Sequence, residues 1–450
     1  MPKVTVIMPS LNVRKYISTC IESVLAQTLQ DIEILAVDAG SDDGTLEILQ
    51  DYARRDERIR LIHSDKRSYG YQINLGISLA QGDYIGIVET DDKISADMYE
   101  TLYGKAIETD SDYVKGHFEK FVDIKQGTSW NMTAPFLILD AAMVGKVVEP
   151  CDMPDLLVRD IYLWTGVYKR EFIAEIKLNE TPGAAFQDQG FLFQTLSSAK
   201  RAVYLDKIVY HYRQDNGSSS IFNPKGFRYL VEEYAYIGTF LSDKTEGWHH
   251  SYYRRMFNQC IGRFVTMGVS GRYWIEAESE MNILREKVTG AVEHKLIRKT
   301  DMSAERWEML ELFLKGTKEI YTCCAEQYAD KARELRDVYS IIGDQRAIIF
   351  GSGIYGKFFH ALLENKMPGV AVAYCDNNSG LWGKEIQGMK VLSPKEAIRD
   401  YPDALYIIAS LRSAETIERQ LCKYGISGEK IGKFQTTPNM MLFHIPEEVG

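Results

Sequence analysis

Residues 83–92 read DYIGIVETDD, and this stretch decides the fold of the first half of the chain. Its first part is apolar like a buried strand, and its second part places three carboxylates within four residues. Unpaired carboxylates are not buried, so we expect Glu89, Asp91 and Asp92 to lie at the carboxyl end of the strand. In an open α/β sheet that edge binds ligands, and neighbouring carboxylates suit Mg²⁺ or Mn²⁺. A solvated turn that caps the next helix is the alternative interpretation.

The residues before this stretch alternate between strands and helices. The patterns predict strands over residues 4–8, 33–37, 59–63 and 84–88, and helices over residues 17–25, 46–54 and 71–80. Such alternation is typical of a doubly wound parallel sheet. The loops that follow the four strands then share one edge, and they cover residues 9–12, 38–45, 65–70 and 89–92. The first loop reads PSLN and is not a glycine-rich turn, which disfavours a dinucleotide fold for this half.

Length and composition limit the class of protein. A chain of 450 residues predicts two or three domains, at about 150 residues each. The net charge of −10 disfavours nucleic-acid binding. No apolar run approaches the ~20 residues of a membrane span, so we expect a cytoplasmic protein, with at most peripheral contact at the inner face of the membrane. The seven cysteines lack metal-site spacing and are interpreted as reduced core residues.

The chain beyond the acidic stretch carries weaker signals. We predict a helix over 98–108, a strand over 112–121 and irregular structure over 126–163. From 224 to about 343 the pattern is helical, with no strand signal. Within it, residues 252–255 read YYRR; we interpret them as a solvated helix face rather than a contact for an acidic polymer or a membrane.

A second sheet is predicted from residue 346. A strand over 347–350 runs into GSGIYG at 351–356, followed by a helix, a strand over 370–375 and then Asp376. This is the arrangement of a mononucleotide-binding half. Candidates for a second nucleotide site are therefore Gly351, Gly353, Gly356 and Asp376. An empty fold in which the glycines only make a tight turn is the alternative, and residues 405–410 are the only later clear strand that we expect.

Four motifs in the first half resemble the family 2 glycosyltransferases, which have the glycosyltransferase-A fold. They are VIMPSLN at 6–12, VDAGSDDGT at 37–45, NLGI at 74–77 and ETDD at 89–92. The resemblance covers roughly residues 1–220 and implies a glycosyltransferase-A type nucleotide-binding sheet. In that family the first two loops hold the base and ribose of a nucleotide-sugar, usually a uridine one. The acidic loop holds Mn²⁺ or Mg²⁺ on the diphosphate.

The resemblance assigns roles residue by residue. Donor-binding roles fall on Pro9, Asn12, Asp38, Glu89, Asp91 and Arg213. Metal-binding roles fall on Asp91, Asp92 and His211. Ala39 stands where many members place a second Asp against the base, which leaves the nucleotide open. Glu89 replaces the first Asp of the metal motif, and its longer side chain is expected to contact ribose or sugar.

The resemblance also implies a catalytic base. The family places a Glu-Asp pair at the start of a helix, and its Asp deprotonates the acceptor. Here the pair reads Gln187 and Asp188. A single carboxylate is what an inverting displacement requires, so Asp188 is the candidate base, and a helix cap is the alternative.

These features imply an inverting, metal-dependent glycosyltransferase. It would move a hexosyl or N-acetylhexosaminyl group from a nucleoside-diphosphate sugar, typically UDP-linked, to a hydroxyl of a glycan, glycolipid or polyol-phosphate acceptor in cell-surface polysaccharide synthesis. Ala39, Glu89 and Gln187 support the alternative of a catalytically idle nucleotide-sugar-binding regulator. An NAD-linked sugar oxidoreductase working through 351–356 is the weaker alternative, because the sequence shows no hydride-transfer machinery.

The predicted organisation has three segments. Residues 1–222 form the catalytic domain, 223–343 a helical domain or linker, and 344–450 a small Rossmann-like α/β domain, which is suited to pairing in a homo-oligomer. The sequence identifies neither the sugar nor the acceptor.

Overall fold

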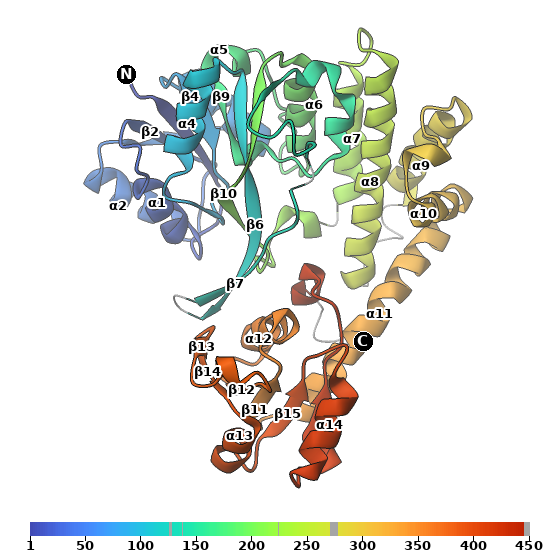
Figure 1. The fold of residues 1–450 in the computed structure, drawn as a ribbon. Helices are drawn as coiled ribbons and strands as arrows, with labels where there is room; N and C mark the ends of the chain where they lie inside the picture. Colours follow the sequence, from blue (N-terminus) through green and yellow to red (C-terminus); the bar gives the residue numbers. More distant parts are fainter. Residues whose placement is uncertain (126–127, 137, 224, 271–277, 445–450) are drawn as a thin grey trace. The chain divides into compact units, whose positions relative to one another are not determined.

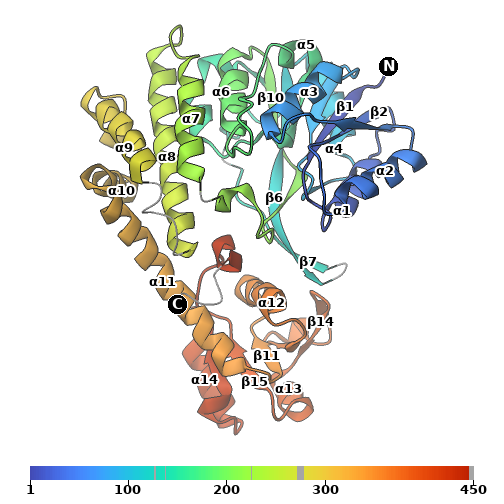
Figure 2. The same ribbon diagram turned by 180° about the vertical axis from the view of Figure 1, so that it is seen from behind.

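The computed structural model describes residues 1–125, 128–136, 138–223, 225–270 and 278–444 (Figures 1 and 2). The chain divides into two compact units. Unit 1 comprises residues 1–120, 133–264 and 273–320, and unit 2 comprises residues 121–132, 265–272 and 321–450. Residues 224 and 271–277 of the predicted helical segment lie outside the described residues. The functional independence of the segments 1–222, 223–343 and 344–450 stays a prediction.

Unit 1 is built on the predicted parallel sheet. Four strands lie parallel to their neighbours in the order β3-β2-β1-β4: β1 (Val4–Ser10), β2 (Ile32–Asp38), β3 (Ile59–His63) and β4 (Tyr84–Ile87). Every residue of β1, β2 and β4 is buried, which explains why these strands read as continuous apolar runs. The helices that connect and follow them are α1 (Ile17–Leu25), α2 (Thr45–Arg55), α3 (Tyr69–Leu79) and α4 (Met98–Thr109). The predicted parallel α/β fold is confirmed.

The sheet continues with antiparallel strands in the order β4-β9-β6-β10-β5. These strands are β5 (Lys93–Ile94), β6 (Tyr113–Lys125), β9 (Gly166–Lys169) and β10 (Ala202–Arg213), with β8 (Val147–Val148) paired to β10. Val167 of β9 pairs with both Gly86 of β4 and Val114 of β6. Because β9 is antiparallel to both strands, β4 and β6 run in the same direction. Strand β6 therefore runs from its start toward the edge of the sheet that carries the acidic loop.

The rest of unit 1 is helical. Its elements are η1 (Pro150–Asp152), η2 (Pro154–Val158), η3 (Leu163–Thr165), α5 (Arg170–Ile173), α6 (Asp188–Ser198), η4 (Ser220–Phe222), α7 (Gly226–Gly238), α8 (Glu246–Ser270), α9 (Glu278–Glu293), η5 (Lys299–Asp301) and α10 (Ala304–Lys315). Helix α6 is buried along nearly its whole length and packs against α7 (Figure 1). The predicted helical middle region is confirmed for the described residues. No helix among them has a stretch long and apolar enough to cross a membrane.

Unit 2 holds a six-stranded sheet in the order β13-β14-β12-β11-β15-β16. Its strands are β11 (Ala347–Phe350), β12 (Ala371–Cys375), β13 (Glu385–Ile386), β14 (Met389–Leu392), β15 (Leu405–Ile408) and β16 (Ile431–Lys433). Its helices are α11 (Thr317–Ile342), which begins in unit 1, α12 (Ile354–Lys366), η6 (Ser379–Leu381), α13 (Pro394–Asp400), α14 (Ala414–Lys423), η7 (Gly428–Lys430) and η8 (Met440–His444). The expectation of a single strand after residue 375 is wrong. Strands β13 and β16 have only two and three residues, and β14 contains the exposed Lys390, so none of them reads as a fully apolar run of the kind that marks β11 and β15.

The end of β6 and strand β7 (Thr128–Met132) belong to unit 2. Val122, Ile124 and Trp130 are buried in the apolar core of that unit, together with Leu335 of α11. The Trp130 ring centroid lies 5.1 Å from that of Phe358. The prediction of irregular structure over 126–163 is therefore wrong at the strands 128–132 and 147–148, while residues 126–127 and 137 lie outside the described residues. The unit 2 core contains residues far apart in sequence.

Candidate active site

The loops after β1 and β2 interlock at the carboxyl edge of the sheet. Asp38 is buried, and its carboxylate accepts hydrogen bonds from the backbone N–H groups of Gly40 and Ser41 at 2.9 Å and from the Ser41 hydroxyl at 2.6 Å. Asn12 has a φ of 55°, and its Oδ1 accepts from the Asp42 N–H at 2.9 Å. The structure thus brings the predicted nucleotide-binding residues together. Asp38 and Asn12 act on the shape of the loop through backbone groups.

The acidic loop is tied to the end of β1, and helix α3 is tied to the ends of β1 and β2. Thr90 Oγ1 donates to the Pro9 carbonyl at 2.9 Å. The buried Gln72 side chain donates to the carbonyls of Ser10 and Val37, at 2.9 and 2.6 Å. Three segments far apart in sequence therefore form one rigid edge.

The carboxylates Glu89, Asp91 and Asp188 share one electrostatic environment. Burial raises the pKa of Glu89 to about 8; its hydrogen bond from the Tyr69 hydroxyl opposes the shift, and the charges of Asp91 and Asp188 add to it. Burial also raises the pKa of Asp91. Asp91 Oδ2 accepts from Asn216 at 2.7 Å, and Oδ1 accepts no hydrogen bond from a described residue. Asp188 therefore lies close enough to the acidic loop for its charge to add to the raised pKa of Glu89.

Asp92 is placed differently from the other two acids of the motif. It is 1% exposed, and its oxygens accept from the Tyr210 hydroxyl at 2.8 Å and the Arg213 N–H at 2.7 Å. Burial raises its pKa well above the usual range of an aspartate. The expectation that all three carboxylates lie outside the core is wrong for Asp92, because this carboxylate anchors the loop to β10.

Neither ring nitrogen of His211 is free to contact the acidic loop, because both take part in hydrogen bonds. Its Nδ1 lies 2.7 Å from Glu119 Oε1, and its Nε2 lies 3.1 Å from Ser95 Oγ. Both ring nitrogens have hydrogen-bond partners, so this geometry does not support the predicted role of His211 as a metal ligand.

Arg213 lies beneath the acidic loop and is buried. Its Nε donates to the Asp91 carbonyl at 2.7 Å, and its NH1 lies 3.0 Å from Asp215 Oδ1. Arg213 therefore positions the backbone of the loop, and the predicted contact with a diphosphate stays untested.

The residues present fit a divalent cation only in part. Among the described residues, no group of three or more His, Cys, Asp or Glu side chains could hold a metal ion. Asp91 Oδ1 is nevertheless available to a cation, because it accepts no hydrogen bond from a described residue. It belongs to the same loop as the carboxyl group of Glu89, whose pKa is raised. Mg²⁺ and Mn²⁺ are commonly bound by one or two carboxylates together with substrate phosphates, and Asp91 meets that requirement.

Asp188 opens helix α6, and the N-cap of this helix is Gln187, which makes no side-chain cap hydrogen bond. Burial raises the pKa of Asp188, whereas the positive charge of Arg255 lowers it. Gln189 Nε2 donates to Asp188 Oδ2 at 2.8 Å, and Arg255 Nε donates to Gln189 Oε1 at 2.8 Å. Arg255 lies on α8, so the helical region contributes to the site. No pattern in the sequence predicts this contact, because it joins positions far apart in the chain.

The Gln187 side chain is buried and connects separate segments of the chain. From the sequence alone, Gln187 was interpreted only as a replacement of the Glu in the family's Glu-Asp pair. Its Oε1 accepts from the Gly70 N–H at 2.9 Å. Its Nε2 donates to the carbonyls of Asn179 and Thr181, at 2.6 and 3.1 Å. An amide both accepts and donates, and a carboxylate could not bond these two carbonyls. Gln187 therefore joins the start of α6 to the start of α3.

Gln187→Glu is expected to lower the free energy of unfolding by roughly 1–3 kcal/mol, because two buried carbonyls lose their donor and face a carboxylate. Urea denaturation at pH 7.5 measures this change. Gln50→Glu, on the exposed surface of α2, is the matched control and should change stability by less than about 0.5 kcal/mol. Equal stability of both variants would contradict the connecting role of Gln187.

Glu233 of α7 anchors the first turn of α6, and the sequence analysis missed it. Its oxygens accept from the Gly190 N–H at 2.8 Å and from Asn179 Nδ2 at 3.2 Å. Burial raises the pKa of Glu233 to about 8. A Cβ added to Gly190 would lie 2.5 Å from Glu233 Oε1, so a side chain here would displace the Glu233 carboxylate from its present position. The helix that presents Asp188 is thus held by side chains at its first turn.

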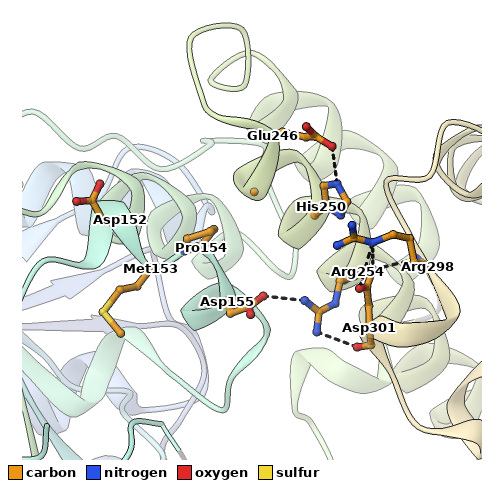
Figure 3. Close-up of a pocket in the computed structure, with 10 residues that line it drawn as sticks. Asp152, Met153, Pro154, Asp155, Glu246, His250, Arg254, Arg298 and Asp301 are labelled. Atoms are coloured by element: carbon orange, nitrogen blue, oxygen red, sulfur yellow. Dashed lines mark hydrogen bonds and ion pairs between the residues drawn. The ribbon is translucent and has the colours of Figure 1, made fainter.

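A polar pocket of about 630 Å³ lies beside η1, η2, α8 and η5 (Figure 3). In it Arg254 donates to Asp155 Oδ1 at 2.7 Å and to the Asp301 carbonyl at 3.0 Å. Arg298 is also paired with Asp301. Tyr252 is buried. The interpretation of residues 252–255 as a solvated helix face is wrong, because these side chains hold the helical region together.

In unit 2 the glycine-rich loop at 351–356 is held by hydrogen bonds to Asp376, the acidic residue of the same motif. Asp376 Oδ2 accepts from the Ser352 N–H at 2.9 Å and the Ser352 hydroxyl at 2.7 Å. Gly351 has a φ of 108°, and a Cβ added to Gly356 would lie 1.8 Å from the Gly351 carbonyl oxygen. Gly353 is the N-cap of α12. Gly351 is needed for the turn and Gly356 for the approach of the helix, whereas a side chain at Gly353 would meet no atom within 4 Å. No observation tests nucleotide binding here.

Comparison with known proteins matches two families. Residues 5–152 match the model of Glycosyl transferase family 2, and residues 343–432 match that of C2185-like, N-terminal. The uncharacterized glycosyltransferase EpsJ of Bacillus subtilis is 32% identical over 219 residues, which are 48% of this chain and 62% of EpsJ. Glycosyltransferase GlyG of Streptococcus pneumoniae is 29% identical over 218 residues, 48% of this chain and 72% of GlyG. The match therefore spans less than two thirds of EpsJ.

Solved structures show the same fold. S. aureus TarS 1–349 in complex with UDP-GlcNAc aligns with a TM-score of 0.51 at 19% identity, over 73% of this chain and 92% of that one. The expected glycosyltransferase-A type sheet in the first half is confirmed. Asp188, His211 and Arg213 lie beyond the residues that match the family 2 model.

Proposed function

Because residues 5–152 form a family 2 glycosyltransferase domain, we propose that this protein transfers a hexosyl or N-acetylhexosaminyl group from a nucleoside-diphosphate sugar to an acceptor hydroxyl. The similarity to TarS in complex with UDP-GlcNAc supports a UDP-linked donor. The acceptor is a glycan, a glycolipid or a polyol phosphate, and the setting is cell-surface polysaccharide synthesis at the inner face of the membrane.

The observation that carries this proposal is the meeting of Asp188 with the acidic loop. The N–H of Gly70 donates to Gln187, the residue before Asp188, at 2.9 Å, and the hydroxyl of the neighbouring Tyr69 donates to Glu89 of the acidic loop. Two motifs separated by about a hundred positions therefore lie at one edge of the sheet, the edge where open α/β sheets bind their ligands.

The reaction proposed is a single displacement. Asp188 removes the proton of the acceptor hydroxyl as its oxygen attacks the anomeric carbon. The bond from that carbon to the diphosphate breaks on the opposite face, so the configuration inverts. The raised pKa makes Asp188 a stronger base than an exposed aspartate.

The remaining residues bind and orient the donor. We assign the nucleoside to the loops at 9–12 and 38–45, shaped by Asn12 and Asp38. Asp91 would hold Mn²⁺ or Mg²⁺, and Glu89 would contact the ribose or the sugar. A bound cation supplies positive charge on the leaving diphosphate. Asp92 and Arg213 keep the loop in place from β10.

Unit 2 is proposed to be a Rossmann-like domain that takes part in assembly. Its parallel strands and glycine loop support the topology. A nucleotide bound by Gly351, Gly353, Gly356 and Asp376 stays a proposal, as does a homo-oligomer. The connecting role of Gln187 removes one argument for an idle catalytic half.

The test is donor turnover with a panel of UDP- and GDP-linked hexoses and N-acetylhexosamines in the presence of Mn²⁺ or Mg²⁺. Release of nucleoside diphosphate from at least one donor, abolished by EDTA, is the expected result. Donor binding without release under any condition would favour the idle regulator. Neither binding nor release across the panel would contradict the proposal.

A further inference from the structure

Arg255 of α8 reaches the proposed base through one intermediate side chain. Its Nε donates to Gln189 Oε1 at 2.8 Å, and Gln189 Nε2 donates to Asp188 Oδ2 at 2.8 Å. Gln189 is 5% exposed, so its amide is shielded from water, whereas Asp188 and Arg255 are half-buried. Two hydrogen bonds in series therefore join a guanidinium to the carboxylate that is assigned to the acceptor proton.

The direction of the Gln189 amide is fixed by Arg255. A guanidinium N–H only donates, so the carbonyl oxygen of Gln189 must face it, and the NH2 group is left for Asp188. Gln259 Nε2 also lies 3.3 Å from Gln189 Oε1. The amide of Gln259 can present either a donor or an acceptor, so it would allow both directions. Of these two partners, Arg255 therefore determines which end of Gln189 faces the base.

This direction favours one protonation state of Asp188. An NH2 donor bonds more strongly to a charged carboxylate than to a neutral carboxylic acid. The reversed amide would present its oxygen to Asp188, and that oxygen could pair only with the protonated acid. A general base must be deprotonated before it can take a proton from the acceptor. The order of guanidinium, amide and carboxylate therefore favours the form of Asp188 that acts as a base.

The other charged groups around Asp188 do not supply this effect. Burial raises the pKa of four neighbouring groups, and the charge of Asp188 adds to the increase: Glu89 of the acidic loop, Tyr69 of α3, and Glu233 and Tyr234 of α7. All four are neutral or negative. The acidic residues of η1 and η2, which also pack against α6, are Asp152 and Asp155, and they line the pocket of Figure 3. Burial raises the pKa of Asp188, and the largest effect of a charge on it is that of Arg255, which lowers it.

We propose that Arg255 is a positioning residue for the base: acting through Gln189, it holds Asp188 in the orientation and in the ionised form that take the acceptor's proton. This inference rests on the proposed function, because it assigns how Asp188 is prepared for sugar transfer. Arg255 lies on α8, beyond the residues that match the family 2 model. The helical region thereby sets the pH range in which the first half of the chain works.

The pH dependence distinguishes this role from a structural one. The base works only when it is ionised, so turnover falls as the pH drops below the pKa of Asp188. Because Arg255 lowers that pKa, removal of its charge raises the pKa and moves the acid limb of the profile to higher pH. Arg255 NH1 also donates to the Arg159 carbonyl at 3.2 Å. Loss of that structural contact alone would change stability, or turnover at every pH, without moving the limb.

The test is the pH profile of kcat of the full chain between about pH 5.5 and 9.5. It follows release of nucleoside diphosphate from the fastest donor of the panel above, with Mg²⁺ and with water or methyl N-acetylglucosaminide as the acceptor. Arg255→Met removes the charge and keeps an unbranched side chain. It should be roughly 10-fold slower or more on the acid limb, as expected from loss of a nearby opposite charge, and within about threefold of the wild type at the alkaline plateau.

Three further variants test the path through the amide. Gln189→Met breaks the series and should move the limb in the same direction. The double variant should turn over no more slowly than the slower single variant, because the two residues act as one unit. Arg255→Lys keeps the charge and should return the limb toward its wild-type position.

Arg254→Met is the matched control on the same helix. Arg254 is paired with Asp155 in the pocket of Figure 3, so its loss should lower the melting temperature and leave the limb in place. An unmoved limb in folded Arg255→Met, or equal shifts in Arg255→Met and Arg254→Met, would overturn the inference. If melting shows that Arg255→Met is unfolded, Gln189→Met decides in the same way. Absence of release from every donor by the wild type would instead count against the glycosyltransferase activity itself.

Discussion

Asp188→Asn is expected to lower the rate of sugar transfer by about 10²–10⁴-fold, the range associated with a positioned acid or base. Donor affinity should not change, because Asp188 is assigned to the acceptor proton. The amide keeps an oxygen that can accept from Gln189, as Asp188 Oδ2 does at 2.8 Å, so the helix should stay in place.

Steady-state kinetics with saturating donor, donor titration by calorimetry and thermal melting together check this result. Asp206→Asn, at an exposed position of β10, is the control and should leave all three unchanged. Transfer at the wild-type rate by Asp188→Asn would reduce Asp188 to a structural residue at the start of α6. A product that retains the anomeric configuration would rule out the single displacement.

The second large effect is expected from Asp91→Asn, which should abolish donor binding that depends on a divalent cation. The loss should be at least the roughly 10–100-fold that removing outer-shell partners of a metal typically produces. The ligand-free protein should not melt at a lower temperature, because burial disfavours the Asp91 charge and asparagine removes that charge. Calorimetric titration of UDP-sugar with Mn²⁺, and with EDTA in its place, measures the difference.

Comparison with Asp92→Asn distinguishes a residue that binds the metal ion from a residue that holds the acidic loop to β10. Asp92 accepts from Tyr210 and from the Arg213 N–H, and it is buried. Its substitution should lower the melting temperature, whereas Asp91→Asn should not. Unchanged donor affinity in Asp91→Asn, with and without chelator, would contradict the assignment of Asp91 to the cation.

The parallel core could be predicted because β1, β2 and β4 are buried on both faces and therefore read as apolar runs. Helix α1 shows its buried side in the same way, through Ile17, Cys20, Ile21 and Val24. The shared edge of the loops follows from the direction of parallel strands, so the sequence also indicated that the loops around Asp38 and Asp91 meet. The prediction of the sheet and of its loop edge therefore depends on local periodicity and on the rule that neighbouring parallel strands end at the same edge.

The roles of individual polar residues could not be predicted in the same way. Asp91 and Asp92 are neighbours in sequence and chemically identical, yet only Asp92 is held by two groups of β10. Gln187 and Arg255 act through partners far along the chain, which periodicity does not record. Strands β13, β14 and β16 of unit 2 were missed because they are partly exposed and lack the fully apolar run that identified the equally short β11 and β15.

The membership of residues 121–132 in unit 2 has a consequence for the order of synthesis. Val122, Ile124 and Trp130 leave the ribosome long before α11 and the strands of unit 2 that complete their core. The parallel sheet of unit 1 can fold before those later residues are synthesised, because its own residues are close in sequence. The three apolar side chains remain exposed to solvent until their core partners have been synthesised. Transiently exposed apolar surface is where nascent chains aggregate or engage chaperones. If translation stops before residue 335, the released polypeptide has a complete sheet in unit 1 but an incomplete core in unit 2. The apolar side chains of β6 and β7 that belong to that core are then exposed and favour aggregation.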